Sequence, residues 1–214
     1  MRLEYANYDV ASNEAEFKEN LIQASKYSPS VISVLPSFLK LAKSNIGENT
    51  KLATVVDFPF GIMDSDTRNL SVNNCIKNGA QIIEMVVPSY YLCNRKYDKI
   101  KQDIIAQYQT GIYSNIEIRY ILEYRVFSLD VLCRVAQLLL NNNIMTIIPS
   151  TGQLLDDVSD NLIASAMIQK KVPALNIIAN GNVWNDRHVE LIRSQKLYGF
   201  RTYSLNSLQK IANN

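Results

Sequence analysis

The chain has 214 residues, with 22 basic and 20 acidic side chains and 47% apolar residues. This composition is typical of a globular protein and excludes a disordered or fibrous polymer. The basic residues are dispersed among acidic ones, so we expect no nucleic-acid partner. No stretch approaches about 18 uninterrupted apolar residues, and the first residues lack the apolar run of a signal peptide. We therefore expect no membrane association and a cytoplasmic location.

Eight short runs of apolar and β-branched residues recur along the chain, and each predicts a strand. The runs are residues 3–6, 31–35, 52–56, 82–87, 116–122, 144–148, 174–179 and 200–203. The segments between them carry apolar residues at helical spacing. We expect one helix to end at Gly79 and another, from residue 97, to stop at Gly111. Ser128 is the predicted N-cap of the next helix, and a further helix covers residues 158–167.

Each interval between successive strands has room for one strand and one helix. Strands that alternate with helices pair in parallel through right-handed crossovers. Eight such units predict an α/β protein with a compact (β/α)8 TIM barrel. Because no linker-like segment interrupts the chain, residues 1–214 are predicted to form a single domain.

Several strand ends carry motifs, and the functional sites of such barrels lie at these ends. Residues 51–61 read KLATVVDFPFG, residues 30–38 read SVISVLPSF, and residues 149–152 read PSTG. With residues 79–88, these segments resemble the deoxyribose-phosphate aldolase family in order and spacing, from about residue 3 to about residue 208. The resemblance implies a TIM barrel. It also implies a class I lyase that joins or splits acetaldehyde and a phosphorylated aldehyde through a lysine Schiff base.

The chain departs from this family at the positions of its lysines. The Schiff-base lysine position is Ile148, and the second lysine position is Ile178. A third family lysine corresponds to Arg119, whose guanidinium does not deprotonate. Since an isoleucine cannot form an imine, the sequence predicts a divergent member without Schiff-base aldolase activity. Lys96 is the nearest replacement candidate, but its basic neighbours indicate a solvated helical turn, and Lys51 belongs to the opposite end of the barrel.

The resemblance also indicates residues that would bind a small phosphorylated or carbonyl ligand. In the family, a serine-threonine-glycine turn, a glycine pair and a turn at the last strand present backbone amides to phosphate. The candidate ligand-binding residues here are Asp57, Ser150, Thr151, Gly152, Asn180, Gly181, Asn182, Arg201 and Ser204. Arg201 stands at a former glycine, so it either supplies charge to an anion or belongs to an altered surface loop.

Glu84, at the family's proton-shuttling aspartate position, and Arg119 are candidate catalytic residues. By the period of two, both fall on the set of residues that the resemblance implies to face the barrel lumen, and Glu123 has the same parity as Arg119. In one interpretation Glu84 and Glu123 form an acid/base pair and Arg119 clamps an anionic substrate. In the other, Glu84 and Arg119 form an internal ion pair. We expect no cofactor and no metal, because glycine-rich nucleotide loops are absent and there is one histidine.

Three functional hypotheses follow. The first is a pseudoenzyme that binds a small molecule or a protein partner. The second is a lyase or isomerase that uses Glu84, Glu123 and Arg119 on a carbonyl substrate without an imine. The third is a structural subunit that partners an active paralogue, and the chain is also a possible homo-oligomer.

Overall fold

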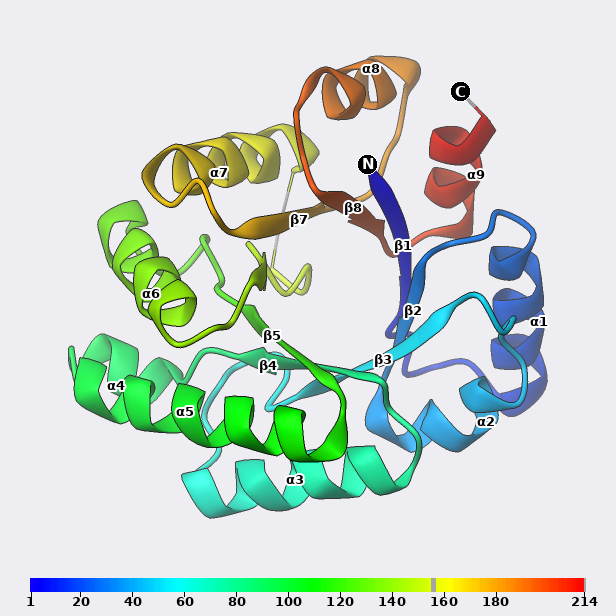
Figure 1. The fold of residues 1–214 in the computed structure, drawn as a ribbon. Coiled ribbons are helices and arrows are strands. Elements are labelled where there is room, and N and C mark those ends of the chain that lie inside the picture. Colours follow the sequence, from blue (N-terminus) through cyan, green and yellow to red (C-terminus); the bar gives the residue numbers. More distant parts are fainter. Residues whose placement is uncertain (155–156, 214) are drawn as a thin grey trace.

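Eight parallel strands close into a barrel in the computed structural model, which describes residues 1–154 and 157–213. Each strand pairs with the next along the chain, and β8 pairs with β1 (Figure 1). The strands are β1 Arg2–Asn7, β2 Val31–Val34, β3 Lys51–Val56, β4 Ile82–Val86, β5 Glu117–Ile121, β6 Thr146–Ile148, β7 Asn176–Asn180 and β8 Gly199–Thr202. The predicted TIM barrel is confirmed, and each strand lies within two residues of its predicted bounds.

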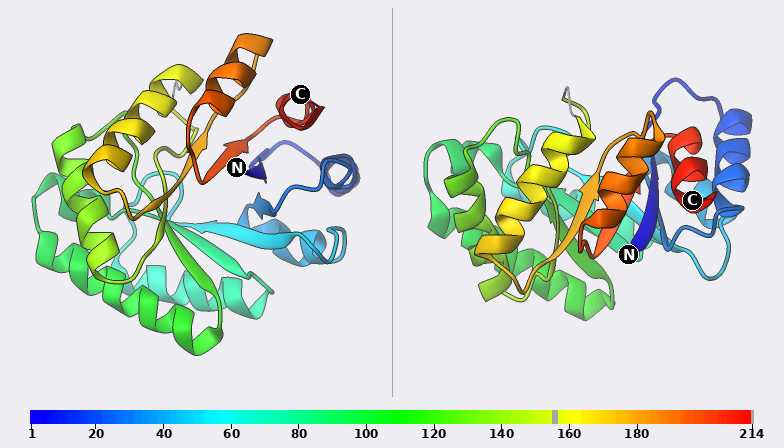
Figure 2. Two further views of the ribbon diagram at one scale, coloured as in Figure 1. Left: turned by 45° about the horizontal axis from the view of Figure 1, so that its top comes forward. Right: turned by 90° about the horizontal axis from the view of Figure 1, so that it is seen from above.

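Helices cover the outside of the barrel (Figures 1 and 2). They are α1 Glu14–Ser25, the 3-10 helix η1 Pro36–Phe38, α2 Leu39–Lys43, α3 Ser65–Lys77, α4 Ser89–Cys93, α5 Tyr97–Ser114, α6 Leu129–Asn141, α7 Val158–Lys171, α8 Asp186–Ser194 and α9 Leu205–Asn213. The last helix, α9, packs beside α1, so the ring of helices closes where the barrel closes.

The alternation of side chains along each strand separates two buried regions. Outward residues such as Ile32, Ile83 and Ile147 are fully buried against the helices, together with helix residues such as Ile104 and Leu132. Inward residues fill the lumen. Burial on both faces explains why the strands read as continuous apolar runs rather than as alternating ones.

Most of the predicted helix signals are confirmed. Ser128 is the N-cap of α6, and α7 begins at Val158. Asp64 caps α3 by accepting the N–H of Thr67 at 3.0 Å, and Gly79 follows the end of α3 with a φ of +98°. A left-handed φ of this kind is the conformation that glycine adopts at the end of a helix.

The prediction that Gly111 ends its helix is wrong. Helix α5 continues through Gly111 to Ser114, and Asn115 takes the left-handed C-cap conformation with φ 53°. Gly111 has a packing role instead, because a Cβ atom there would come within 2.8 Å of Ile118 Cγ1. The missing side chain therefore lets α5 lie close to the start of β5.

The chain direction gives the barrel two distinct ends. The carboxyl ends of the strands lead into the loops that hold the sequence motifs, and the amino ends open on a separate cavity beside Arg2, Lys51 and Glu117. No helix within the described residues is long and apolar enough to cross a membrane.

Candidate functional site

Four charged side chains fill the middle of the lumen: Glu4 of β1, Glu84 of β4, Arg119 of β5 and Arg201 of β8, each at most 1% exposed. Arg119 Nη1 donates to Glu4 Oε1 at 2.9 Å and to Glu84 Oε1 at 3.4 Å. Arg201 Nη2 donates to Glu4 Oε2 at 2.6 Å and to Glu84 Oε1, and its Nη1 donates to Glu84 Oε2 at 2.6 Å. Each arginine thus contacts both carboxylates. We refer to these four residues as the lumen ion network.

The network is electrically balanced, with two carboxylates and two guanidinium groups. Burial alone would raise the pKa of Glu84, but Arg201 and Arg119 outweigh burial and hold that pKa below its usual range. Burial alone would lower the pKa of Arg201, and the carboxylates of Glu84 and Glu4 raise it above its usual range instead. Glu84 and both arginines are therefore charged at neutral pH.

Two hydroxyl groups complete the contacts of Glu84. Ser33 Oγ donates to Glu84 Oε2 at 3.0 Å, and the Tyr8 hydroxyl lies 3.4 Å from the same oxygen and 2.8 Å from Ser33 Oγ. Burial, and then the charge of Glu84, raise the pKa of Tyr8 well above its ordinary value. The Glu84 carboxylate is thus saturated by donors from the protein, which leaves it poorly suited to accept a substrate proton.

An apolar layer fills part of the lumen beside the lumen ion network. It consists of Val55, Val86, Ile121, Ile148 and Ile178. Val86 lies two residues beyond Glu84 on β4, so it faces the lumen one step closer to the strand ends. Ile148 and Ile178 are 1% and 0% exposed. Apolar side chains therefore occupy both positions at which the resemblance described above implies a lysine.

Glu123 lies above this layer, directly after β5, in a left-handed conformation with φ 65°. Its Oε2 accepts the backbone N–H of Thr151 at 2.9 Å and the Thr151 hydroxyl at 2.6 Å. A backbone N–H in such a turn is a donor that can hold an anion, and here the protein's own carboxylate occupies it. The contacts of Glu123 are separate from those of Glu84.

The remaining polar residues near β6 and β7 bind one another. Asn180 Nδ2 donates to Ser150 Oγ at 2.9 Å and to the Tyr203 hydroxyl at 2.6 Å. Asn161 of α7 bonds to both the side chain and the backbone of Asn180, each at 3.0 Å. The Tyr203 ring covers Gly152, since an added Cβ at residue 152 would come within 2.6 Å of the Tyr203 oxygen. This cluster closes the region where an anion would meet the turn.

Asp57 serves to hold the loop after β3. Its Oδ1 accepts the N–H groups of Ile62 and Met63 at 2.8 and 3.0 Å, and its Oδ2 accepts from Arg68 of α3. Arg68 also donates twice to Asp103 of α5 at 3.1 Å. Asp57 has a φ of 58°, a strained conformation for a residue other than glycine, and these bonds keep it in place.

The other candidate ligand residues lie around the end of β8. Gly181 follows β7 with a φ of +154°. The Thr202 hydroxyl lies 3.3 Å from Asn182 Oδ1 and accepts the backbone N–H of Ser204 at 3.4 Å. The interpretation of Arg201 as part of an altered surface loop is wrong. Its side chain is long enough to reach from β8 across the lumen to β4, where carboxylates neutralise it.

Neither lysine that the sequence analysis considered lies in the lumen. Lys96 is exposed at the N-cap position of α5, with its ammonium 5.0 Å from the centre of the Tyr90 ring. Lys51 is exposed at the first residue of β3, at the amino ends of the strands. Among the described residues, no group of three or more His, Cys, Asp and Glu side chains could hold a metal ion.

A mostly apolar cavity of about 650 Å³ lies at the carboxyl-terminal end, between the loops after β3, β4, β5 and β6. We refer to it as the mouth pocket. Its walls include Phe60, Ile62, Val87, Leu122 and Phe127, and Glu123 and Thr151 lie at its polar edge. Phe60 and Ile62 are 63% and 70% exposed and present apolar surface at the pocket edge.

Comparison with known proteins finds deoxyribose-phosphate aldolases. The chain is 26% identical over 192 residues to the deoxyribose-phosphate aldolase of Mycoplasmopsis pulmonis, which covers 87% of this chain and 85% of that one. It is 28% identical over 106 residues to the Streptococcus gordonii enzyme and over 96 residues to the Clostridium tetani enzyme. Those two matches span 48% and 44% of the relatives, about half of their length. No family model matches the chain.

Solved structures agree in fold. An aldolase named QR15 superposes with a TM-score of 0.86 at 18% identity, covering 98% of this chain and 92% of that one. The deoxyribose phosphate aldolase of Aeropyrum pernix gives a TM-score of 0.80 at 15% identity, covering 99% and 88%. This chain is a relative of the deoxyribose-phosphate aldolases. Its barrel is aldolase-like.

Sequence reasoning missed three partners of the network, Glu4, Tyr8 and Ser33. A signal for Glu4 is present, because it is a charged residue in the middle of a predicted strand. Tyr8 follows β1 and Ser33 is a small polar residue within β2. The contacts of Tyr8 and Ser33 with Glu84 become apparent only once the barrel is closed.

Proposed function

We propose that this aldolase-like barrel performs no Schiff-base chemistry and acts by binding a small carbonyl compound without a phosphate group in the mouth pocket. One observation carries the first part of the proposal. Ile148 and Ile178 are buried in the apolar layer, so no amine from these positions can reach a carbonyl carbon. The exposed positions of Lys96 and Lys51, away from the lumen, offer no replacement.

The absence of a phosphate group follows from the state of the turn at residues 150–152. The N–H of Thr151 is bonded to the Glu123 carboxylate, and Tyr203 covers Gly152. An incoming phosphate would have to displace one anion and one aromatic ring. Arg201, the remaining candidate for a phosphate contact, is neutralised by two carboxylates. A neutral ligand avoids each of these costs.

The mouth pocket suits a ligand with an apolar body and one polar group. Its volume of about 650 Å³ lies within the range of about 300–1,000 Å³ found for small-molecule sites. Leu122, Val87 and Phe127 supply apolar wall, and Gln153 adds an amide at the rim. An acid/base reaction that uses Glu84 and Arg119 is disfavoured, because both are fully buried in the lumen ion network.

The binding proposal is tested with acetophenone, which has an aromatic ring, a carbonyl and no phosphate. Methyl NMR is recorded during its titration into the wild-type chain. We expect the signals of Val87, Leu122 and Val126 to shift in a saturable manner, and the Val87→Ala variant to bind more weakly. A control change at an exposed residue remote from the pocket, Ile22→Ala, should leave binding unaltered. Absence of saturable shifts at the methyl groups of the mouth pocket would contradict the proposed binding.

A further inference from the structure

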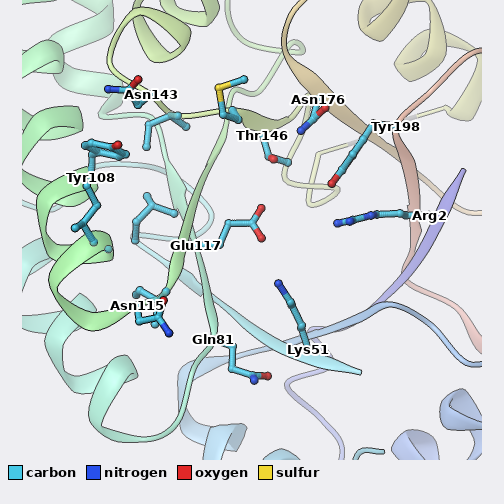
Figure 3. Close-up of a pocket in the computed structure, with 16 residues that line it drawn as sticks. Arg2, Lys51, Gln81, Tyr108, Asn115, Glu117, Asn143, Thr146, Asn176 and Tyr198 are labelled. Carbon is cyan, nitrogen blue, oxygen red and sulfur yellow. The ribbon is translucent and has the colours of Figure 1, made fainter. Parts of the chain in front are cut away.

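A second cavity opens at the opposite end of the barrel, around the amino ends of the strands. It has a volume of about 830 Å³ and is lined by residues from several strands and by the end of α5 (Figure 3). This is not the end where barrels of this fold place their sites. In this chain, however, the cavity at the amino-terminal end is lined by charged and polar side chains, whereas the mouth pocket is mostly apolar.

Two cations face this cavity. Arg2 of β1 and Lys51 of β3 point toward its centre, where Glu117 of β5 also lies (Figure 3). Glu117 would be their natural partner, but its Oε1 accepts from Arg119 Nε at 2.7 Å. The lumen ion network below is neutral, so Glu117 adds one negative charge and the two cations add two positive charges. The cavity therefore carries a net charge of about +1, which favours an anion.

Arg2 is held in position for such a role. Its guanidinium lies over the Tyr198 ring, 4.7 Å from the centroid, and its backbone N–H donates to the Tyr198 carbonyl at 3.0 Å. A stacked guanidinium loses less side-chain freedom when it binds an anion than a free one does.

Hydrogen-bonding groups also line this cavity without partners. The side chains of Lys51, Thr146 and Asn176 make no hydrogen bond or ion pair to any residue within 1–154 and 157–213. Thr146 is 4% exposed and lines the cavity wall. At the carboxyl-terminal end, by contrast, the side chains of Glu123 and Asn180 are engaged by neighbouring residues. A polar ligand could bond to these groups without breaking a bond within the described part of the protein.

From this geometry we propose that the amino-terminal cavity binds a small anion that carries a phosphate or carboxylate group together with hydroxyl groups. The anionic group lies between Lys51 and Arg2, and the hydroxyl groups bond to Thr146 and Asn176. The cavity volume exceeds that of a single inorganic ion and matches a small metabolite. The proposal does not depend on the mouth pocket or on the fate of Schiff-base chemistry.

Calorimetric titration at low salt tests the site with three probes: glycerol 3-phosphate, glycerate and neutral glycerol. We expect at least one anion to bind, glycerol to bind no more than negligibly, and added salt to weaken binding. Preference for glycerol 3-phosphate would identify the anionic group as phosphate, and preference for glycerate would identify it as carboxylate. Amide NMR shifts should fall on residues 146 and 176.

The Lys51→Gln variant should raise Kd for the anion by about ten-fold or more, since it removes a charge-assisted contact. Lys51 is exposed and unpaired, so the variant is expected to fold as the wild type does. Lys96→Gln, which removes the same charge at the other end, is the matched control and should leave Kd unchanged. No binding of either anion, or equal weakening by both variants, would overturn the proposal. Neither result would bear on acetophenone binding in the mouth pocket.

Discussion

At the scale of single residues, Arg201 has the largest effect on the character of the lumen. A glycine at this position would leave space on the inner face of β8. The arginine fills that space and bonds to Glu4 and Glu84, both fully buried. With Arg119, it converts the centre of an aldolase-like barrel into a self-contained set of ion pairs. Such pairs are strongly destabilising when one partner is removed, because an uncompensated charge stays buried.

We therefore predict that Arg201→Met lowers the free energy of unfolding by about 3–5 kcal/mol. The double variant Glu84→Leu with Arg201→Met removes one charge of each sign and should be less destabilised than the sum of the two single changes. Urea unfolding followed by circular dichroism measures both. Arg187→Met, at an exposed position, is the control. A loss under about 1 kcal/mol for Arg201→Met would contradict a stabilising role of the network.

The lumen ion network also predicts a pH dependence. The pKa of Glu84 is held below its ordinary value of 4.5, so the folded state binds its proton more weakly than the unfolded state. The charged form therefore contributes stability that is present above pH 4.5 and is lost as the pH falls through the folded-state pKa. Glu84→Gln should have a lower free energy of unfolding than the wild type at pH 7. This difference in free energy should become smaller as the pH falls below 4.5. A difference that stays constant from pH 7 into this acid range would contradict the assignment.

At the scale of elements, much of the fold could be predicted from the sequence, because the strands are short, mostly apolar runs and each interval between strands holds at least one helix. Asp64 and Gly79 mark the ends of α3 through local chemistry alone. The prediction for Gly111 was wrong because this residue lets α5 pack closely against β5, a contact that the local sequence does not reveal. The parity of Glu84 and Arg119 correctly placed both in the lumen, and of the two interpretations left open the structure shows the ion pair, whereas the contact of Arg201 with Glu84 spans 117 residues. Local pattern carries no information about such a contact.

Gly111→Ala tests the packing explanation for α5. Alanine favours a helix by about 1 kcal/mol over glycine, so a solvent-facing glycine would gain stability. At this position the added Cβ meets Ile118 Cγ1 at 2.8 Å and the Ile116 carbonyl at 3.1 Å, and overpacking costs about 1–3 kcal/mol. We expect a net loss of stability in thermal unfolding. The neighbouring Ile112→Ala, at a position 59% exposed, should change stability little. A gain from Gly111→Ala would refute the packing role.

At the scale of the whole molecule, the two ends of the barrel differ in how their polar groups are satisfied. The carboxyl-terminal end combines an internally bonded turn with the apolar mouth pocket, and the amino-terminal cavity is lined by Arg2, Lys51, Glu117 and uncharged polar side chains. The closed pairing of β1 with β8 links the first and last strands. Whether copies of the chain associate stays a prediction, which light scattering against the monomer mass of 24.3 kDa would test.

Because the lumen ion network joins β1, β4, β5 and β8, we expect the whole barrel to unfold as one unit. Far-ultraviolet and near-ultraviolet circular dichroism should report the same urea midpoint. Two separated transitions would contradict both a single cooperative barrel and the predicted single domain at residues 1–214.

The absence of imine chemistry is tested most directly by reductive trapping. The folded chain is exposed briefly to acetaldehyde and borohydride, and each lysine is then examined by peptide mass spectrometry. A deoxyribose-phosphate aldolase that retains its lysine serves as the positive control, and the unfolded chain measures background reaction at surface amines. With Ile148 and Ile178 at the two positions where the resemblance implies lysines, we predict no lysine that reacts faster in the folded chain than in the unfolded one. Selective, stoichiometric ethylation of one lysine in the folded chain would contradict the account.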